Sequence, residues 1–164
     1  MNKLSMLIFA AVVVSSVVLQ AAVLPMFLDI PFRPDLLLVI TVYVALRVSF
    51  EAGTPLAWGL GLLKDVFSGV YLGLNAFAFL VVFLVIRSVS ERLYAESGFL
   101  FVVTVIAATI VSVGCDFLLL LLFNLTNGIA YTISAALIPH LLINAFAASL
   151  VTLLPGFARD EELA

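Results

Sequence analysis

The sequence predicts an all-α membrane protein, with one integral membrane domain over residues 1–164 and six transmembrane helices. Its residues are 65% hydrophobic and only 10% charged, and its mean hydropathy is +1.34. Soluble domains carry about 25% charged residues, so this composition excludes one. Six spans of about 20 residues each use most of the chain, and the loops between them are short.

The residues at the ends of each apolar run set the expected helix boundaries. The first run begins after Lys3 and closes near Pro25; it is similar to a secretory signal peptide, but its length favours a retained helix. The second helix begins at Asp35, after a loop with two prolines, and Asp35 suits the positive end of the helix dipole. The six helices are expected at residues 4–28, 35–50, 53–70, 72–90, 99–123 and 131–154.

The third helix, residues 53–70, is the least apolar of the six. A run of charged and helix-breaking residues, 47–55, is expected to end the second helix and lead into it. Lys64 and Asp65 lie side by side near its centre. Each costs about 2.5 to 3.5 kcal/mol at the middle of a bilayer, and together they exceed the roughly 2 to 4 kcal/mol gained from the apolar side chains. We therefore expect this helix to be stable only when other helices cover its polar side.

Three glycines are expected to share a stripe with Asp65. Gly61, Gly69 and Gly73 lie at multiples of four residues from Asp65 and would fall on one helical face. Small residues on such a face let a second helix approach closely. Lys64 lies about 100° around the helix, so its long stem is expected to reach toward a membrane interface.

The last three helices carry the remaining polar residues of the spans. The fourth has Asn75 one turn after its start and ends in the charged segment 87–97. The fifth places Asp116 on one face with a threonine and a serine. The sixth contains Pro139, which is expected to kink it, and His140 and Asn144 four residues apart on one face.

The basic residues indicate that both termini lie in the cytoplasm. This orientation puts five basic residues inside and only Arg33 outside, which is a strong positive-inside bias. The five are Lys3, Arg47, Arg87, Arg92 and Arg159. The polar residues of the spans then lie in the outer half, where charged groups face protein or a wet cavity. We expect an outward-facing recess formed by Asp35, Lys64, Asp65, Asn75, Asp116, His140 and Asn144.

Three interpretations of this recess remain open from the residues alone. It is structural, with its charged groups satisfying one another; or it binds a small molecule or a partner's helix; or it is catalytic. In the catalytic case Asp65 and Asp116 would form a water-activating dyad. The chain length suits a lipoprotein signal peptidase, but that family's asparagine-containing aspartate motifs and four-span layout are missing.

Other classes of function are excluded or disfavoured. The chain has no serine-hydrolase elbow, zinc-binding His-Glu-x-x-His or phosphate loop, and no cofactor or metal is expected. The single cysteine, Cys115, excludes an internal disulfide and a cysteine zinc site. A net charge of −3 and a pI near 4.9 argue against a nucleic-acid partner.

The segment from about residue 33 to 80 resembles the rod shape-determining protein MreD family. The motifs are Pro34-Asp35, the Gly-Leu-Leu-x-Asp type segment that ends at Asp65, and the Gly73-Leu-Asn75 start of the fourth helix. Lys64 is a departure, because an apolar residue is expected directly before Asp65. In its layout the resemblance covers the whole chain.

The resemblance implies a non-enzymatic, multi-pass protein of the bacterial inner membrane in the elongation machinery of the peptidoglycan wall. Such a protein pairs with MreC, a single-span protein, and lies among membrane lipids close to MreB, RodA and its transpeptidase. The family is also distantly similar in fold to the S components of energy-coupling-factor transporters, which are six-helix bundles. That similarity implies an alternative function, a membrane subunit that binds a solute or lipid.

Overall fold

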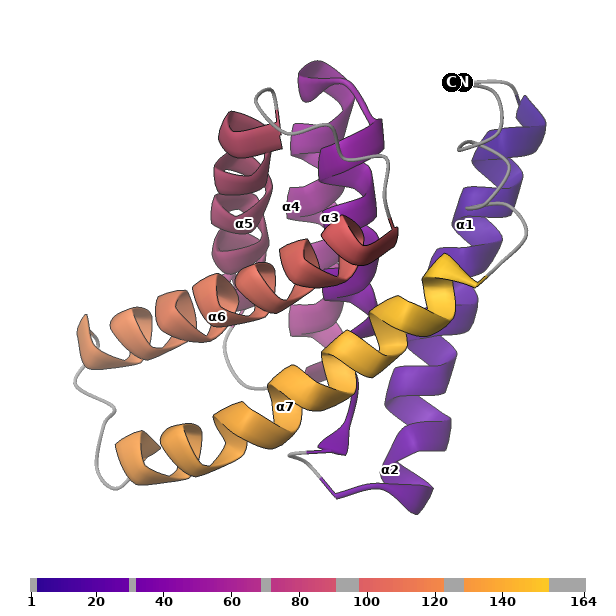
Figure 1. The fold of residues 1–164 in the computed structure, drawn as a ribbon. Helices are drawn as coiled ribbons and strands as arrows, with labels where there is room; N and C mark the ends of the chain where they lie inside the picture. The colour runs from indigo at the N-terminus through magenta and orange to yellow at the C-terminus, as the bar shows by residue number, and fades with distance from the viewer. Residues whose placement is uncertain (1–2, 30–31, 69–71, 91–97, 123–128, 154–164) are drawn as a thin grey trace.

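The computed structural model describes residues 3–29, 32–68, 72–90, 98–122 and 129–153, and this part of the chain is helical with no strand. The elements are α1 (Lys3–Val18), η1 (Leu19–Val23), α2 (Leu24–Phe27), α3 (Leu36–Arg47), α4 (Phe50–Ser68), α5 (Leu74–Ser90), α6 (Gly98–Leu122) and α7 (Ile129–Thr152). Helices α3, α4 and α5 stand side by side, α1 lies along the side of α3, and α6 and α7 form a pair that crosses the others obliquely (Figure 1).

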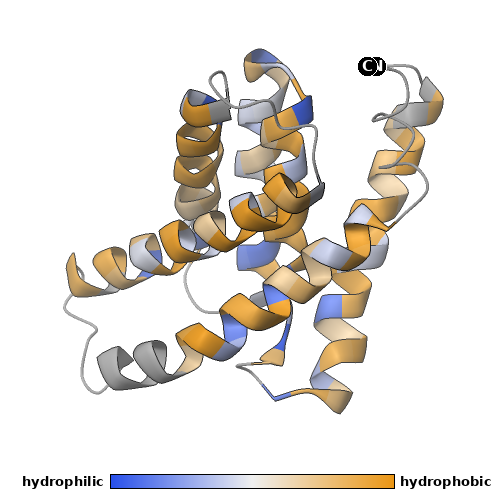
Figure 2. Cartoon of the chain, in the orientation of Figure 1, coloured by the Kyte–Doolittle hydropathy of each residue, from blue (hydrophilic) through white to orange (hydrophobic). Residues whose placement is uncertain are grey.

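Two stretches of the described chain are long and apolar enough to cross a membrane, Met6–Phe27 and Gly98–Leu119. Three shorter apolar helices fall within α3, α5 and α7. Helix α4 belongs to neither group, as its Lys64 and Asp65 led us to expect. The coloured chain is hydrophobic along most helices, with hydrophilic segments few and concentrated at helix ends and in the lower half of the bundle (Figure 2). These features agree with a helical membrane protein.

The first predicted span is not one regular helix. Helix α1 passes into a five-residue π-helical turn, η1, and the short helix α2 then ends at Phe27. Pro25 lies at the start of α2, although we expected it at the end of the span. A proline ring clashes with the carbonyl four residues earlier in an α-helix, here that of Ala21, so the wider π turn accommodates Pro25.

Helix α4 begins earlier than predicted. The helix was expected to begin at Gly53, with Gly53 and Pro55 in the turn that leads into it, but α4 begins at Phe50 and both residues lie inside it. Pro55 is exposed on the side of α4 that faces away from the core, and the Thr54 hydroxyl donates to the Phe50 carbonyl at 2.7 Å. Pro55 has no N–H to donate to the Glu51 carbonyl, and α4 continues through it with one internal hydrogen bond fewer.

Helix α3 is the centre of the structure and packs against α1, α4, α5, α6 and α7. It can occupy this position because no charged residue lies between Asp35 and Arg47. Phe79, Phe83 and Phe101 from α5 and α6 are fully buried around it. Its own buried side chains are Leu37, Leu38, Val39, Thr41, Val42, Val44 and Ala45.

Helices α4 and α5 touch through their backbones at Gly61. A Cβ atom on Gly61 would lie 2.5 Å from the Asn75 carbonyl oxygen and 2.7 Å from the Ala76 nitrogen. Both of those atoms are backbone and cannot rotate away. Gly59 lies two residues earlier on the same helix, and a Cβ atom there would meet no neighbouring atom within 4 Å.

This contrast gives a matched pair of substitutions. Gly61→Ala is expected to lower the free energy of unfolding by at least about 2 kcal/mol, because the added methyl group forces the two helices apart. Gly59→Ala is expected to be neutral or to stabilise by about 0.5 kcal/mol, since alanine favours the helix. Thermal unfolding of both variants in the same detergent measures the difference, and equal melting temperatures would contradict this packing.

Candidate functional site

Asp65, on the last turns of α4, caps the start of α5. Its carboxylate accepts from the main-chain nitrogens of Gly73 at 2.8 Å, Asn75 at 3.0 Å and Ala76 at 3.1 Å, and from the Asn75 side-chain amide at 2.9 Å. The first turn of a helix leaves such N–H groups without partners, and a negative charge there suits the helix dipole. Asp65 is only 2% exposed, so the buried charge is stabilised by the helix that it caps.

Gly73 makes this capping turn possible. Its φ of +100° lies in the left-handed region, which residues other than glycine rarely adopt. The turn directs the N–H groups of Gly73 and Asn75 back toward Asp65. Gly73 therefore belongs to the turn before α5 and not to the stripe of α4 on which we expected it.

Substitution of Gly73 tests the conformation of this turn. Gly73→Ala is expected to cost about 1 to 2 kcal/mol, because a Cβ atom there meets no neighbour and only the backbone strain remains. Gly73→Asn is expected to cost less, since asparagine tolerates this region better. The free energies of unfolding of the two variants provide the measurement, and an alanine variant as stable as wild type would contradict the conformation.

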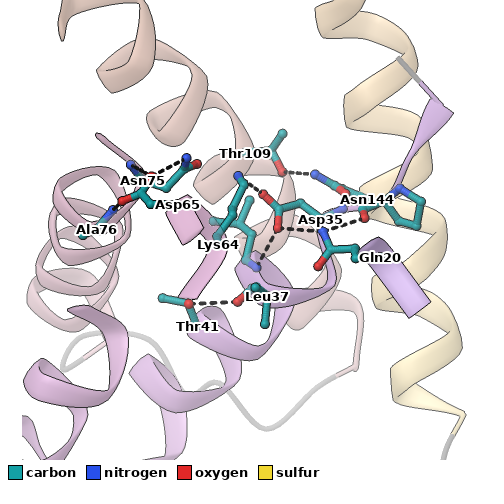
Figure 3. Close-up of polar contacts among 12 residues, drawn as sticks. Gln20, Asp35, Leu37, Thr41, Lys64, Asp65, Asn75, Ala76, Thr109 and Asn144 are labelled. Atoms are coloured by element: carbon teal, nitrogen blue, oxygen red, sulfur yellow. Dashed lines mark hydrogen bonds and ion pairs between the residues drawn. The ribbon is translucent and has the colours of Figure 1, made fainter. Parts of the chain in front are cut away.

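A second group of polar side chains, the Asp35 cluster, joins five elements of the chain. Asp35 lies directly before α3 and its carboxylate accepts from the Leu38 nitrogen at 3.1 Å, as a helix N-cap does. The Lys64 ammonium from α4 donates to the other oxygen at 2.5 Å. The Gln20 amide in η1 donates to Asp35 at 3.3 Å and to the Pro34 carbonyl at 3.1 Å. Figure 3 shows these groups converging on Asp35.

The last two helices reach the Asp35 cluster through Asn144. Its side-chain oxygen on α7 accepts from the Asp35 main-chain nitrogen at 2.7 Å. Its amide nitrogen donates to the Thr109 hydroxyl of α6 at 3.1 Å, and that hydroxyl donates to the Val105 carbonyl. Asn144 and Thr109 are fully buried. We define the cluster as Gln20, Asp35, Lys64, Thr109 and Asn144 (Figure 3).

Lys64 turns into the protein and does not reach for the membrane interface as we expected. Its side chain is 24% exposed, and its ammonium lies 5.0 Å from the centre of the Phe79 ring. A cation over an aromatic face gains electrostatic attraction. The ion pair with Asp35 and the Phe79 ring therefore hold Lys64 between α3 and α5.

Asp116 and His140 lie beside this cluster, both half-buried. Asp116 interacts electrostatically with Lys64, Asp35 and Asp65, and His140 interacts with Asp35 and Lys64. One buried carboxylate oxygen of Asp116 has no hydrogen-bond partner among the described residues. Within this same part of the chain no group of histidine, cysteine or acidic side chains is placed to hold a metal ion.

A comparison with protein families gives the context of this site. The model of a family described as the rod shape-determining protein MreD matches residues 1–158. The chain belongs to the MreD family. Proteins of the MreD family serve in the determination of rod shape. Searches of curated proteins and of solved structures find no match.

In this MreD-family chain the structure separates residues that the sequence had grouped. Asp65 shares no hydrogen bond with Lys64; it binds α5, whereas Lys64 binds Asp35. Gly61 lies at a helix contact, Gly73 lies in a turn, and Gly69 falls outside the described residues.

Sequence reasoning missed the role of Gln20 in this MreD-family protein. Gln20 supplies the polar contact from the first span to the Asp35 cluster. The available signal was its chemistry, because a lone glutamine in an apolar span needs a partner within the protein. Its partner could not be read from the sequence, since the π-helical turn changes which face of the helix it occupies.

Proposed function

We propose that this protein is a non-enzymatic scaffold of the bacterial cell-elongation machinery. In this proposal it spans the inner membrane six times, with both termini in the cytoplasm, and recruits a single-span partner such as MreC. RodA, its transpeptidase and MreB act close to this complex during peptidoglycan synthesis. Membership of the MreD family supports the role in rod shape.

The observation that best supports the proposal is that the buried carboxylates of Asp65 and Asp35 are fully hydrogen-bonded within the protein. Both oxygens of Asp65 receive hydrogen bonds from α5, and both oxygens of Asp35 receive hydrogen bonds within its cluster. A catalytic carboxylate must be within reach of a substrate or water. Asp65 is 2% exposed and Asp35 is 3% exposed, so these groups suit the assembly of helices better than proton transfer.

The outer surface is suited to lipid and to partner helices. Large apolar side chains are exposed along α1 and α6, including Leu7, Val14, Ile110 and Leu118. In lipid, helices associate through close packing and local polar contacts. Such a surface favours a protein that meets its partners inside the bilayer.

Arg87 supports the proposed orientation. Its guanidinium donates to the carbonyls of Ala45 at 3.5 Å and Val48 at 3.4 Å, at the end of α3. This end of α3 lies opposite the end at which α3 and α5 begin (Figure 1). A basic group at this end is expected in the cytoplasm by the positive-inside rule.

The proposal is tested with a variant that keeps the fold but removes the buried ion pair. In Asp35→Asn with Lys64→Met, asparagine preserves the helix cap and methionine replaces the stem of lysine with an apolar chain of similar length. The gene is replaced in rod-shaped cells. Cell width, copurification of the single-span partner and thermal stability are then measured.

A scaffold is expected to tolerate this double variant, with rod shape and partner copurification retained. Gly61→Ala serves as the matched control, because it disturbs helix packing and is expected to weaken both. If the double variant is stable but cells become round, while a small molecule copurifies with wild type alone, the solute-binding alternative is favoured and the scaffold proposal is wrong. The observation that favours this second function is the Asp116 oxygen, which is buried and has no hydrogen-bond partner in the described part of the chain.

A further inference from the structure

Helix α4 stands out because its length is sufficient for a membrane span and its composition is not. It has 19 residues, yet it is absent from the stretches and helices apolar enough for the membrane. The main reason is the pair Lys64 and Asp65, and both side chains bind groups of neighbouring helices. We infer that α4 crosses the membrane only as part of a unit with α3 and α5, whose polar groups neutralise its two charges.

The two charges are neutralised from two different helices. Lys64 pairs with Asp35 at the start of α3, and Asp65 receives the N–H groups at the start of α5. A charged side chain inside a membrane is tolerated when protein partners surround it. Neither α3 nor α5 alone can stabilise both charges, so both neighbours are needed.

One side of α4 packs against α5, and another side is exposed. Gly61 lies against the backbone of α5, and Gly53 lies against the ring of Phe83, which also belongs to α5. The exposed side of α4 carries Trp58, Val66 and Phe67. The two glycines and the two charged groups therefore contact α3 or α5, and these three large apolar side chains are exposed.

During synthesis, α3 is made before α4 and α5 is made after it, so the two charges of α4 obtain their partners at different times. Asp35 precedes Lys64 by 29 residues, so the partner of the ammonium has already been made when α4 appears. The donors to Asp65 follow it by 8 to 11 residues. The carboxylate therefore has no partner until α5 begins, and α4 becomes stable in the membrane together with α5.

The inference is tested in the full-length chain with cysteines at the two ends of α4. In a Cys115→Ala background, two single-cysteine variants place a thiol at exposed positions, Glu51→Cys in the first turn of α4 and Leu72→Cys after its end. A membrane-impermeant maleimide is applied to intact spheroplasts, and labelling is expressed relative to total thiol after denaturation. A crossing helix gives unequal labelling at the two positions, whichever way the chain faces.

Loss of the contact of α4 with either α3 or α5 is expected to make the labelling at positions 51 and 72 more nearly equal. Asp35→Leu removes the partner of Lys64, and Gly61→Leu blocks the approach of α5; each is expected to reduce the ratio of labelling at least threefold. Adding Lys64→Met to Asp35→Leu is expected to restore the ratio. Gly59→Leu is the matched control, because this position is open, and it should leave the ratio unchanged.

Three results would overturn the inference. Equal labelling of positions 51 and 72 in the unaltered background means that α4 does not cross. A ratio maintained in Asp35→Leu or in Gly61→Leu means that α4 crosses without the corresponding neighbour. A ratio that Lys64→Met fails to restore means that Asp35 acts in some way other than by neutralising Lys64.

Discussion

Asp65→Ala is expected to lower the free energy of unfolding by about 4 kcal/mol or more. The substitution leaves the N–H groups of Gly73, Asn75 and Ala76 without their acceptor. An unsatisfied buried donor costs about 1 to 3 kcal/mol, and four donors lose their partner at once, because the Asn75 side-chain amide also donates to Asp65. The start of α5 should fray as a result, and thermal or denaturant-induced unfolding in a fixed detergent measures the loss.

Two variants control for this interpretation of Asp65. Asp65→Asn keeps one oxygen acceptor and is expected to lose about half as much stability, since some of the donors remain satisfied. Glu51→Ala removes an exposed carboxylate from the same helix and is expected to change stability by no more than about 0.5 kcal/mol. If Asp65→Ala behaves like Glu51→Ala, Asp65 does not cap α5.

Lys64→Met is expected to lower the free energy of unfolding by about 3 to 5 kcal/mol, because removal of one partner leaves a buried charge uncompensated. The affected charge is that of Asp35, which is 3% exposed. Lys64→Arg retains the positive charge and should lose much less. A loss below about 1 kcal/mol for Lys64→Met, which is typical of exposed ion pairs, would show that Lys64 is solvated and not paired.

Much of the fold follows from the sequence because apolar runs and helix ends have local causes. Asp35 and the prolines before it mark the start of α3, and long apolar stretches mark α1 and α6. The start of α4 was harder to predict, because glycine and proline, here Gly53 and Pro55, usually disfavour the interior of a helix. Their tolerance depends on the exposed position of Pro55 and on the contact of Gly53 with Phe83, which are tertiary features.

The candidate site was predictable in its members but not in its pairings. Charged residues in apolar spans must find partners, and this requirement selected Asp35, Lys64 and Asp65 from the sequence. Helical geometry alone placed Lys64 away from the pocket of Asp65. It could not reveal that α3 lies on that other side and presents Asp35 to the lysine.

The hydrogen bonds of Asp65 were equally hidden from the sequence. Its donors are mainly backbone groups, and every residue other than proline carries such a group. The turn at Gly73, with its positive φ, directs them toward the carboxylate. A glycine before a helix start is a local signal for such a turn, but the identity of its acceptor is determined by the tertiary structure.

The buried charges of α4 are neutralised by neighbouring helices, and this neutralisation holds the bundle together. A double-mutant cycle of Asp35→Asn and Lys64→Met, with unfolding free energies measured in bicelles, tests it directly. The double variant is expected to be more stable than the sum of the two single losses predicts, by at least about 2 kcal/mol, as for residues in direct contact. Losses that add to within about 0.5 kcal/mol, as for independent sites, would contradict the claim.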